Sequence, residues 1–360
     1  MTLNGTQGYN GYSSLAWSKQ LVSSNGKISQ WNLKLEDAPG ANKSWTFTIA
    51  TQAGDTAAVV TISGTATTGS WAGVLNVAAG DLIWIRADPS ATPTSTTMSC
   101  TALWQPQTAH KQWWCGGAGI LAGGYQEIGT GNWAWSAEAD AQCRAPCAGV
   151  MSNLRVNLDT SPGVSKTRVI ATRKNGSTTG MSVSITGNTD KTGLDAVNTL
   201  TVAEGDLISI YTTLTSGGNN SAQYVTCDFV ATTADRLAFV CGGENQGLNT
   251  GAARYAAITS SNVYVGTAEK YFRNRAPAMT LKRFFVYLNA SPGAGKSYKF
   301  EICVNGTPSA LTITIADAAT SGAVTADVSV TDGQTLSVLE TPSGTPTLRY
   351  ATWGATATYP

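Results

Sequence analysis

One pattern occurs three times in the chain: WNLKLEDAPGANKSWTFTI at 31–49, NLRVNLDTSPGVSKTRVIA at 153–171 and FFVYLNASPGAGKSYKFEI at 284–302. Each copy has a segment of alternating apolar and polar residues, a Pro-Gly pair, a lysine followed by serine or threonine, and a second alternating segment. Alternation with period two is typical of a β-strand with one buried face. The Pro-Gly pair suits the two central positions of a type II turn, since glycine adopts a positive φ easily. Each copy therefore predicts two strands joined by a tight turn.

Landmarks outside this pattern recur with the same period. They are the prolines of the Pro-Gly pairs and a later glycine followed by aspartate or glutamine, at Pro39, Pro162 and Pro292 and at Gly80, Gly205 and Gly333. Both sets have a period of about 125 residues, far longer than a solenoid unit and equal to a whole domain. The sequence therefore predicts three tandem domains, at 1–107, 108–235 and 236–360.

The strand pattern continues through each repeat. Apolar residues alternate with serine or threonine at 45–49, 181–185 and 311–315, and each repeat holds roughly seven or eight such runs separated by turn residues. No stretch shows convincing helical periodicity. We therefore predict an all-β protein of three antiparallel β-sandwiches, of the jelly-roll or immunoglobulin-like kind. An Arg-Ala-Pro motif at 144–146 and at 275–277 leads into the second and third copies, and the first copy lacks part of this leading section.

Composition argues against several classes of function. Only 12% of the residues are charged, and 23 Lys and Arg nearly balance 22 Asp and Glu. A nucleic-acid-binding protein needs a basic surface to displace counterions, so no nucleic-acid partner is expected. No window approaches 18 consecutive apolar residues, so no membrane partner is expected. The first 25 residues lack the basic start and apolar core of a signal peptide.

The string SPGAGKSYKFEICVNGTPSALTIT at 291–314, followed by a Gly-Gln step and by TPSGTPT at 341–347, resembles a module of tailed-bacteriophage virion proteins. It is similar to the β-sandwich repeats of phage fibres, appendages and capsid decoration proteins, and the likeness covers 28–104, 150–231 and 280–354. The resemblance implies a non-enzymatic structural protein of the virion surface, made in the host cytoplasm without a signal peptide. Its expected partners are other virion proteins and further copies of itself. The motifs are turn and strand chemistry, so they imply no catalytic residues and no cofactor.

One motif imitates a nucleotide-binding site. Residues 290–297, ASPGAGKS, fit a permissive phosphate-loop pattern. A true phosphate loop leads into a helix, whose N-terminal amides hold the phosphate. Here Tyr298, Phe300 and Ile302 alternate as in a strand, and the sister repeats lack the second glycine. We interpret the segment as a turn.

Residues suited to catalysis or metal binding are few. His110 is the single histidine, and Glu138 with Asp140 is the best-spaced pair of acids, which we interpret as exposed solubilising residues. Asp81 and Asp206 follow a glycine at the start of a strand, where aspartate caps a turn and calcium binding is the alternative. We therefore expect neither an enzyme nor a metal protein.

The cysteines allow more than one interpretation. A candidate thiol or disulfide cluster comprises Cys100, Cys115, Cys143, Cys147, Cys227 and Cys241. Buried free thiols are the first interpretation, because cysteine is among the most buried residue types. Disulfides are the alternative, with Cys115 paired to Cys143 or to Cys147, and the spacing does not decide between them. The spacing is a weaker zinc pattern than paired CxxC motifs.

An aromatic cluster between the first and second domains is the best candidate for recognition. It comprises Trp113, Trp114, Tyr125, Trp133 and Trp135. Trp133 and Trp135 are two residues apart and so share one face of a strand. Such rings pack in a core or at an interface, or they stack on the faces of sugars. The alternative function is therefore a carbohydrate-binding adhesin or lectin-like array, with a host surface glycan as its partner.

Overall fold

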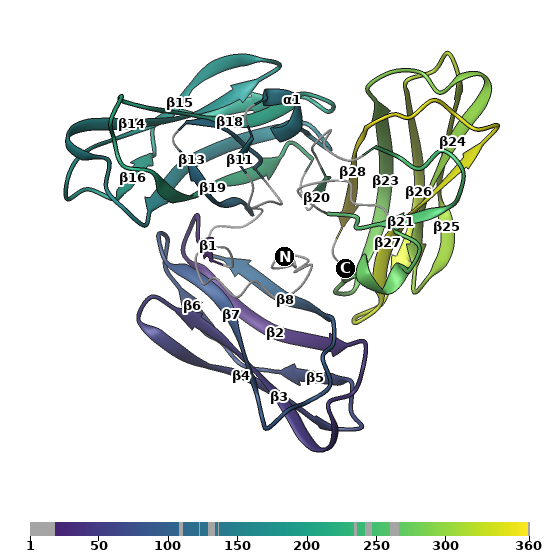
Figure 1. Ribbon diagram of the computed structural model, residues 1–360, viewed down its shortest axis with the longest axis horizontal. Coiled ribbons are helices and arrows are strands. Elements are labelled where there is room, and N and C mark those ends of the chain that lie inside the picture. Colours follow the sequence, from purple (N-terminus) through teal and green to yellow (C-terminus); the bar gives the residue numbers. More distant parts are fainter. Residues whose placement is uncertain are drawn as a thin grey trace.

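The computed structural model describes residues 19–107, 111–121, 123–128, 134–135, 137–233, 236–241, 247–259 and 266–358. These residues form six antiparallel sheets, with only two short helical segments among them. The sheets lie in three face-to-face pairs arranged around a common centre (Figure 1). The prediction of an all-β chain of three tandem sandwiches is confirmed. We refer to the three pairs, in chain order, as modules 1, 2 and 3.

Module 1 contains the strands β1 (Gln20–Leu21), β2 (Gly26–Leu35), β3 (Gly40–Thr51), β4 (Gly54–Gly64), β5 (Thr68–Trp71), β6 (Leu75–Val77), β7 (Leu82–Pro89) and β8 (Met98–Pro106). One sheet has the order β1-β7-β3-β4. In the other sheet, β5 and β6 pair in turn with one edge of β2, and β8 pairs with its other edge. Module 1 sets the pattern for the other two.

Module 2 contains β9 (Gln112–Leu121), β10 (Gly124–Gln126), β11 (Ala134–Trp135), the helix α1 (Glu138–Ala141), β12 (Cys143–Arg144), β13 (Gly149–Leu158), β14 (Gly163–Lys174), β15 (Ser177–Gly187), β16 (Thr192–Asp195), β17 (Leu200–Val202), β18 (Leu207–Leu214) and β19 (Ser221–Ala231). Its sheets have the orders β11-β10-β18-β14-β15 and β16-β13-β19-β9, while β12 pairs with β18 and β17 with β13. The leading section of this repeat thus adds strands to both sheets.

Module 3 contains β20 (Arg236–Cys241), β21 (Arg254–Ala256), the 3-10 helix η2 (Glu269–Tyr271), β22 (Asn274–Arg275), β23 (Met279–Leu288), β24 (Gly293–Val304), β25 (Thr307–Asp317), β26 (Ser321–Val330), β27 (Thr335–Ser343) and β28 (Ala351–Thr358). Its sheets have the orders β21-β27-β24-β25 and β20-β28-β23-β26, and β22 pairs with β27. The long β26 replaces the two short strands found at this place in the other modules.

Each module has its own apolar core between its two sheets. In β2, Trp31, Leu33 and Leu35 are fully buried, while the residues between them are partly exposed. The alternating segments at 181–185 and 311–315 also bury their apolar residues. Period-two alternation therefore identified the buried faces of these strands correctly. Burial on this scale is what stabilises each sandwich.

The glycines of the Pro-Gly pairs have the positive φ that was predicted for them. Gly40, Gly163 and Gly293 have φ values of 102°, 108° and 107°, in the region that glycine adopts most easily. Strand β24 starts at Gly293, so the segment that imitates a phosphate loop is a turn leading into a strand, as we interpreted it. In each module, the side chain six residues after the proline donates a hydrogen bond to an equivalent backbone carbonyl. The pairs are Trp45 with Thr94, Arg168 with Asn219 and Tyr298 with Thr347. One backbone requirement is met by three different donors.

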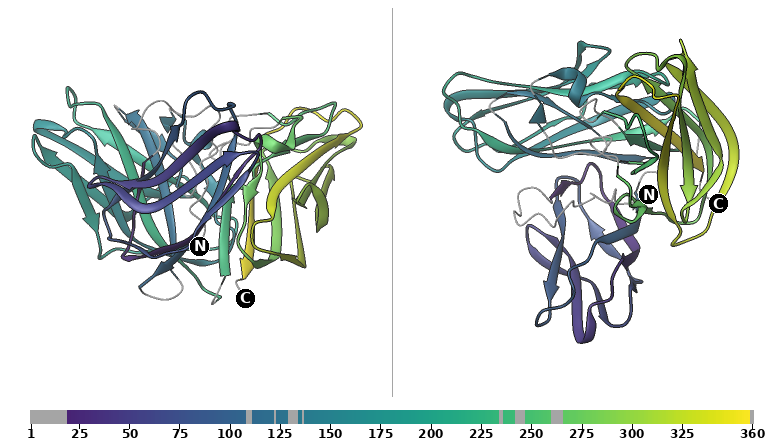
Figure 2. Two further views of the ribbon diagram at one scale, coloured as in Figure 1. Left: turned by 90° about the horizontal axis from the view of Figure 1, so that it is seen from below. Right: turned by 45° about the vertical axis from the view of Figure 1, so that its right-hand side comes forward.

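The modules are arranged so that one sheet of each faces a neighbour. We call this sheet, which contains β2, β13 or β23, the ring sheet of its module. In Figure 1 the ring sheets of all three modules face the middle of the molecule. Figure 2 shows the same three bodies from two further sides, with module 1 in front of modules 2 and 3 in the view from below. The three sandwiches therefore form a ring rather than an extended string.

Candidate functional site

The same short strand precedes the body of every module. Strands β1, β12 and β22 are each two residues long and pair with β7, β18 and β27. The residue after each strand exchanges two backbone hydrogen bonds of 2.8–2.9 Å with the turn that starts the paired strand. These residue pairs are Val22 with Gly80 and Asp81, Ala145 with Gly205 and Asp206, and Ala276 with Gly333 and Gln334. We call each short strand, with the turn it pairs to, the docking edge of its module.

Each docking edge lies against the ring sheet of a different module. Strand β1 contacts β13, β19 and β9 of module 2, and β12 contacts β28 and β20 of module 3. Strand β22 contacts β8 of module 1, which closes the circle. The contacts are head-to-tail, and such contacts form a closed ring when the rotation between units is right. Three equivalent contacts of this kind close the ring. This closed ring is the candidate functional feature of the molecule.

The contact of module 1 with module 2 combines an apolar cluster with charged side chains. Leu21 of the docking edge packs against Tyr224 of β19, and both are buried. The ammonium group of Lys19 lies 5.6 Å from the centre of the Tyr224 ring, within cation–π range. From the opposite side, Arg155 donates from Nε to the carbonyl of Ser23 at 3.0 Å. Apolar packing and charge thus act together at this contact.

The contact of module 2 with module 3 is centred on an arginine. The guanidinium of Arg144 lies 4.1 Å from the centre of the Tyr287 ring, and its Nε donates to Thr352 Oγ1 at 3.1 Å. Arg283 of module 3 returns an ion pair to Glu204 at 2.6 Å. Gly205 has a φ of 85°, which favours glycine, and a methyl group there would lie 3.0 Å from Tyr287 Oη, so another residue would strain the turn and crowd this approach.

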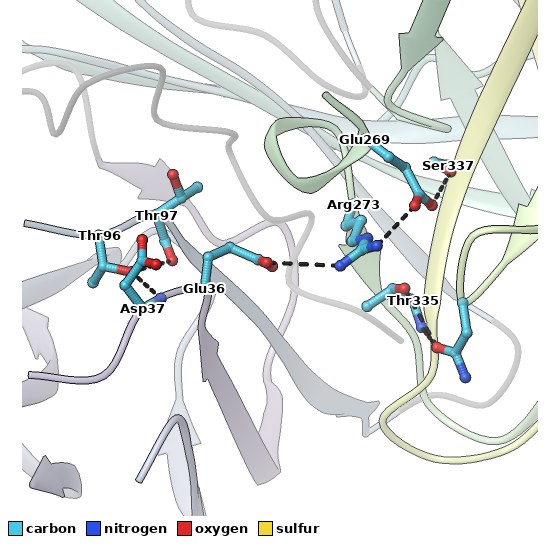
Figure 3. Close-up of polar contacts among 9 residues, drawn as sticks. Glu36, Asp37, Thr96, Thr97, Glu269, Arg273, Thr335 and Ser337 are labelled. Carbon is cyan, nitrogen blue, oxygen red and sulfur yellow. Dashed lines mark hydrogen bonds and ion pairs between the residues drawn. The ribbon is translucent and has the colours of Figure 1, made fainter. Parts of the chain in front are cut away.

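The contact of module 3 with module 1 joins the last module of the chain to the first. Figure 3 shows Arg273, just before β22, extending toward Glu36 at the end of β2, with 3.6 Å between Nη1 and Oε2. Arg275 Nη1 donates to the carbonyl of Leu33 at 3.4 Å. Burial lowers the pKa of Arg275. Asn32 Nδ2 donates to Asp332 at 3.4 Å. This closing contact is therefore built mainly from long polar interactions.

A glutamate supports the arginine on the module 3 side. Glu269 accepts from Arg273 and from Ser337 Oγ, each at 2.8 Å (Figure 3). Glu138 is its counterpart in module 2, where it accepts from Arg173 at 2.8 Å and Ser209 at 2.9 Å. The interpretation of Glu138 as an exposed acid is wrong, because its side chain is only 17% exposed and ion-paired. Burial raises its pKa, but the hydrogen bonds from Arg173 and Ser209 outweigh this and hold the pKa below its ordinary value.

The aromatic candidates are distributed over different places. Trp114 is buried in the core of module 2 and stacks on Phe229 with 4.1 Å between the ring centres. Tyr125 lies on the other sheet, 4.8 Å from Tyr211, and pairs in register with Trp135 of β11. The side chains of Trp113 and Trp135, and the whole of Trp133, are outside the described residues. Recognition by this cluster stays a prediction.

Sequence reasoning missed two partners of Tyr125. The ring of Tyr211 in β18 packs against it at an interplanar angle of 33°, and the guanidinium of Arg173 lies 5.7 Å from the Tyr125 ring centre and 5.5 Å from that of Tyr211. Sequence reasoning also missed the role of Arg144 and Arg275 in the contacts between modules, although the repeated Arg-Ala-Pro motif marks their positions. The motif is the sequence signal that was available for the docking edge.

The candidate cysteines are mostly core residues. Cys100 and Cys143 are buried free thiols, and Cys147 and Cys227 are buried in the core of module 2. Cys143 Sγ donates to the carbonyl of Ile128 at 3.1 Å, and burial raises the pKa of its thiol to about 12. The side chains of Cys115 and Cys241 are outside the described residues, so the proposed pairings with Cys115 stay predictions.

The Gly-Asp steps cap turns, as interpreted. Asp81 Oδ2 accepts from the amide of Ala78, and Asp206 Oδ2 from that of Ala203, each at 2.8 Å. Gln334 takes the same role in module 3. Within the described ranges, no group of three or more His, Cys, Asp or Glu side chains is placed to hold a metal ion. None of the helical segments described is long and apolar enough to cross a membrane.

No protein-family model matches the chain, and no curated protein is significantly similar to it. The fold and the ring of contacts are therefore the basis for inferring function.

Proposed function

We propose that the chain is a non-enzymatic structural protein of a tailed-phage particle, exposed on the capsid or tail as a decoration protein, appendage or fibre component. The observation that carries the proposal is the closed ring of three sandwiches. A ring restrains each module at two places, so it resists bending more than a string of domains joined only by linkers. Such a block suits a mechanical role in an assembly.

Surface chemistry supports the same role. Only 12% of the residues are charged, and the net charge is +1. Nearly neutral neighbours can pack closely without strong mutual repulsion. In β15 and β25 the outward positions between the buried apolar residues hold the small, uncharged Ser182, Ser184, Thr312 and Thr314. Docking onto a repeating lattice would add avidity to weak single contacts.

The test uses purified particles of a phage whose genome encodes the chain. We expect mass spectrometry to find the chain in stoichiometric amount, and gold-labelled antibodies to mark it on the outside of intact particles. A control antibody against an internal virion protein should not label them. Absence of the chain from purified particles would overturn the proposal.

A carbohydrate-binding adhesin is the second candidate, and one observation favours it. Tyr125 and Tyr211 are cross-strand neighbours in one sheet of module 2, with 4.8 Å between their ring centres. Aromatic residues on neighbouring strands form a platform of the kind that sugars stack on. A glycan screen tests it: Tyr125→Ala should abolish a signal that the matched control Tyr271→Ala, at an exposed tyrosine of module 3, leaves intact. No glycan signal from the unmodified chain would exclude this role.

A further inference from the structure

The closing contact differs from the other two in how the chain connects it. Modules 1 and 2, and modules 2 and 3, are consecutive, so the chain itself holds their contacts together. Modules 3 and 1 are joined only by their surfaces. The contacts described there are the ion pair of Arg273 with Glu36, the hydrogen bond of Arg275 to Leu33 and that of Asn32 to Asp332.

Both halves of this contact are carried by every copy of the chain. The docking edge of module 3 offers arginine side chains, and the end of β2 in module 1 offers Glu36 and backbone carbonyls. A head-to-tail contact can be satisfied within one chain or between two chains, because the complementary surfaces are the same in both cases. Exchange also requires the contact of module 2 with module 1 or with module 3 to open, since the closed ring leaves no room for a second copy. Domain exchange of this kind is a low-cost route to dimers.

We propose that the closing contact is also a self-association surface, whose partner is a second copy of this chain. Module 3 of each copy docks on module 1 of the other, so that two copies share two closing contacts. This inference rests on the proposed structural function, which expects self-association. Within one chain, modules 3 and 1 meet at an effective concentration in the millimolar range. The ring therefore closes on itself in dilute solution, and exchange competes where copies are concentrated, as on a particle.

The test uses two cysteine variants that are mixed. In one chain Asn32 is replaced (Asn32→Cys), and in the other Asp332 (Asp332→Cys); the two side chains they replace are 3.4 Å apart across the contact. Each chain has one new thiol, so a disulfide between the new positions forms only when module 3 of one copy sits on module 1 of another. On mild oxidation we expect a covalent dimer of twice 37.4 kDa, increasing with concentration.

Two matched controls make the result decisive. A mixture of Asn32→Cys with Asp327→Cys, at an exposed residue of module 3 outside the contact, should give no dimer above background. A single chain with both Asn32→Cys and Asp332→Cys should form the disulfide within itself in dilute solution, which shows that the variants fold and the ring closes.

Two outcomes would overturn the exchange. One is a dimer no more abundant than with the Asp327→Cys control at millimolar concentration. The other is failure of the doubly substituted chain to close on itself. Neither outcome bears on the presence of the protein in particles, so failure of this inference is distinguishable from failure of the proposed function.

Discussion

Arg144 and Arg275 occupy the same place in the docking edges of modules 2 and 3, but their surroundings differ. Arg144 lies over the ring of Tyr287 and donates to Thr352 Oγ1. In module 1, which receives Arg275, the position equivalent to Tyr287 holds Lys34. Both positions lie five residues before the proline of the Pro-Gly pair. The Nε of Arg275 is buried without a hydrogen-bond partner among the described residues. The repeated backbone of the docking edge places the arginine, and the receiving sheet decides what the arginine contributes.

The largest effect is expected from a buried acid of module 3, the module that supplies the weaker docking edge. Glu340 in β27 is 1% exposed, and neither carboxylate oxygen has a hydrogen-bond partner among the described residues. Burial raises its pKa to about 8, and the positive charge of Arg254 offsets this only in part. The equivalent position of module 2 holds the neutral Thr212, so only module 3 is expected to respond to pH in this way.

The sign follows from the raised pKa. A carboxyl group whose pKa is higher in the folded state stabilises the fold fully below its unfolded pKa, and this stability is lost as pH rises to about 8. At about 1.4 kcal/mol per pKa unit, the loss amounts to a few kcal/mol. This loss of stability is measured by urea titrations at pH 5 and at pH 8, in which amide hydrogen exchange monitors the unfolding of module 3. Glu340→Gln should flatten the pH dependence, and an unchanged slope would contradict this account.

The next effect is a direct comparison of the two arginines. Arg144→Ala removes a cation–π contact and a charge-assisted hydrogen bond, and should lower the free energy of unfolding by about 2–3 kcal/mol. Arg275→Ala removes a long hydrogen bond and a partly unsatisfied buried charge, and should cost less than about 1 kcal/mol. Parallel urea titrations of the two variants measure the difference. Equal losses would show that the receiving sheet does not control the contribution.

Sequence reasoning located the strands, the turns and the capping aspartates, because each depends on neighbours along the chain. It did not locate the ring. The outward positions of β8, β19 and β28 hold Thr101, Thr226 and Thr356, which alternation assigns to solvent, yet they are 2%, 0% and 0% exposed. Alternation distinguishes the two faces of a strand but does not tell whether the second face meets water or another module.

The candidate site shows the same limit. The aromatic residues are close together in the sequence, which suggested one cluster, but Trp114 of β9 is buried in the core of module 2 whereas Tyr125 lies in the other sheet. Tyr211 and Arg173, which contact Tyr125, come from strands β18 and β14, far along the chain. Partners of this kind are set by sheet order, which a single sequence does not display.

A smaller change should make the closing contact resemble the contact of modules 2 and 3. Lys34→Tyr places an aromatic ring at the position equivalent to Tyr287, where the guanidinium of Arg275 can stack on it. The gain expected from a partly exposed cation–π contact is about 0.5–1 kcal/mol. Urea titration measures this gain: Lys34→Tyr should raise the free energy of unfolding by this amount. Lys34→Thr, which removes the charge without adding a ring, is the control and should have less effect.

The smallest effect separates the two ion pairs of the ring. Glu36 pairs with Arg273 at 3.6 Å, and Glu204 with Arg283 at 2.6 Å, in both cases with partly exposed side chains. Pairs of this kind contribute about 0.2–1 kcal/mol and are screened by salt. In Glu36→Gln, small-angle scattering should show a slightly more open molecule at low salt, and added salt should have little further effect. Glu204→Gln should leave the molecule compact, because Arg144 still holds that contact through Tyr287. If both variants opened equally, the two contacts would be of equal strength. The closing contact would then not be the preferred site of module exchange between copies.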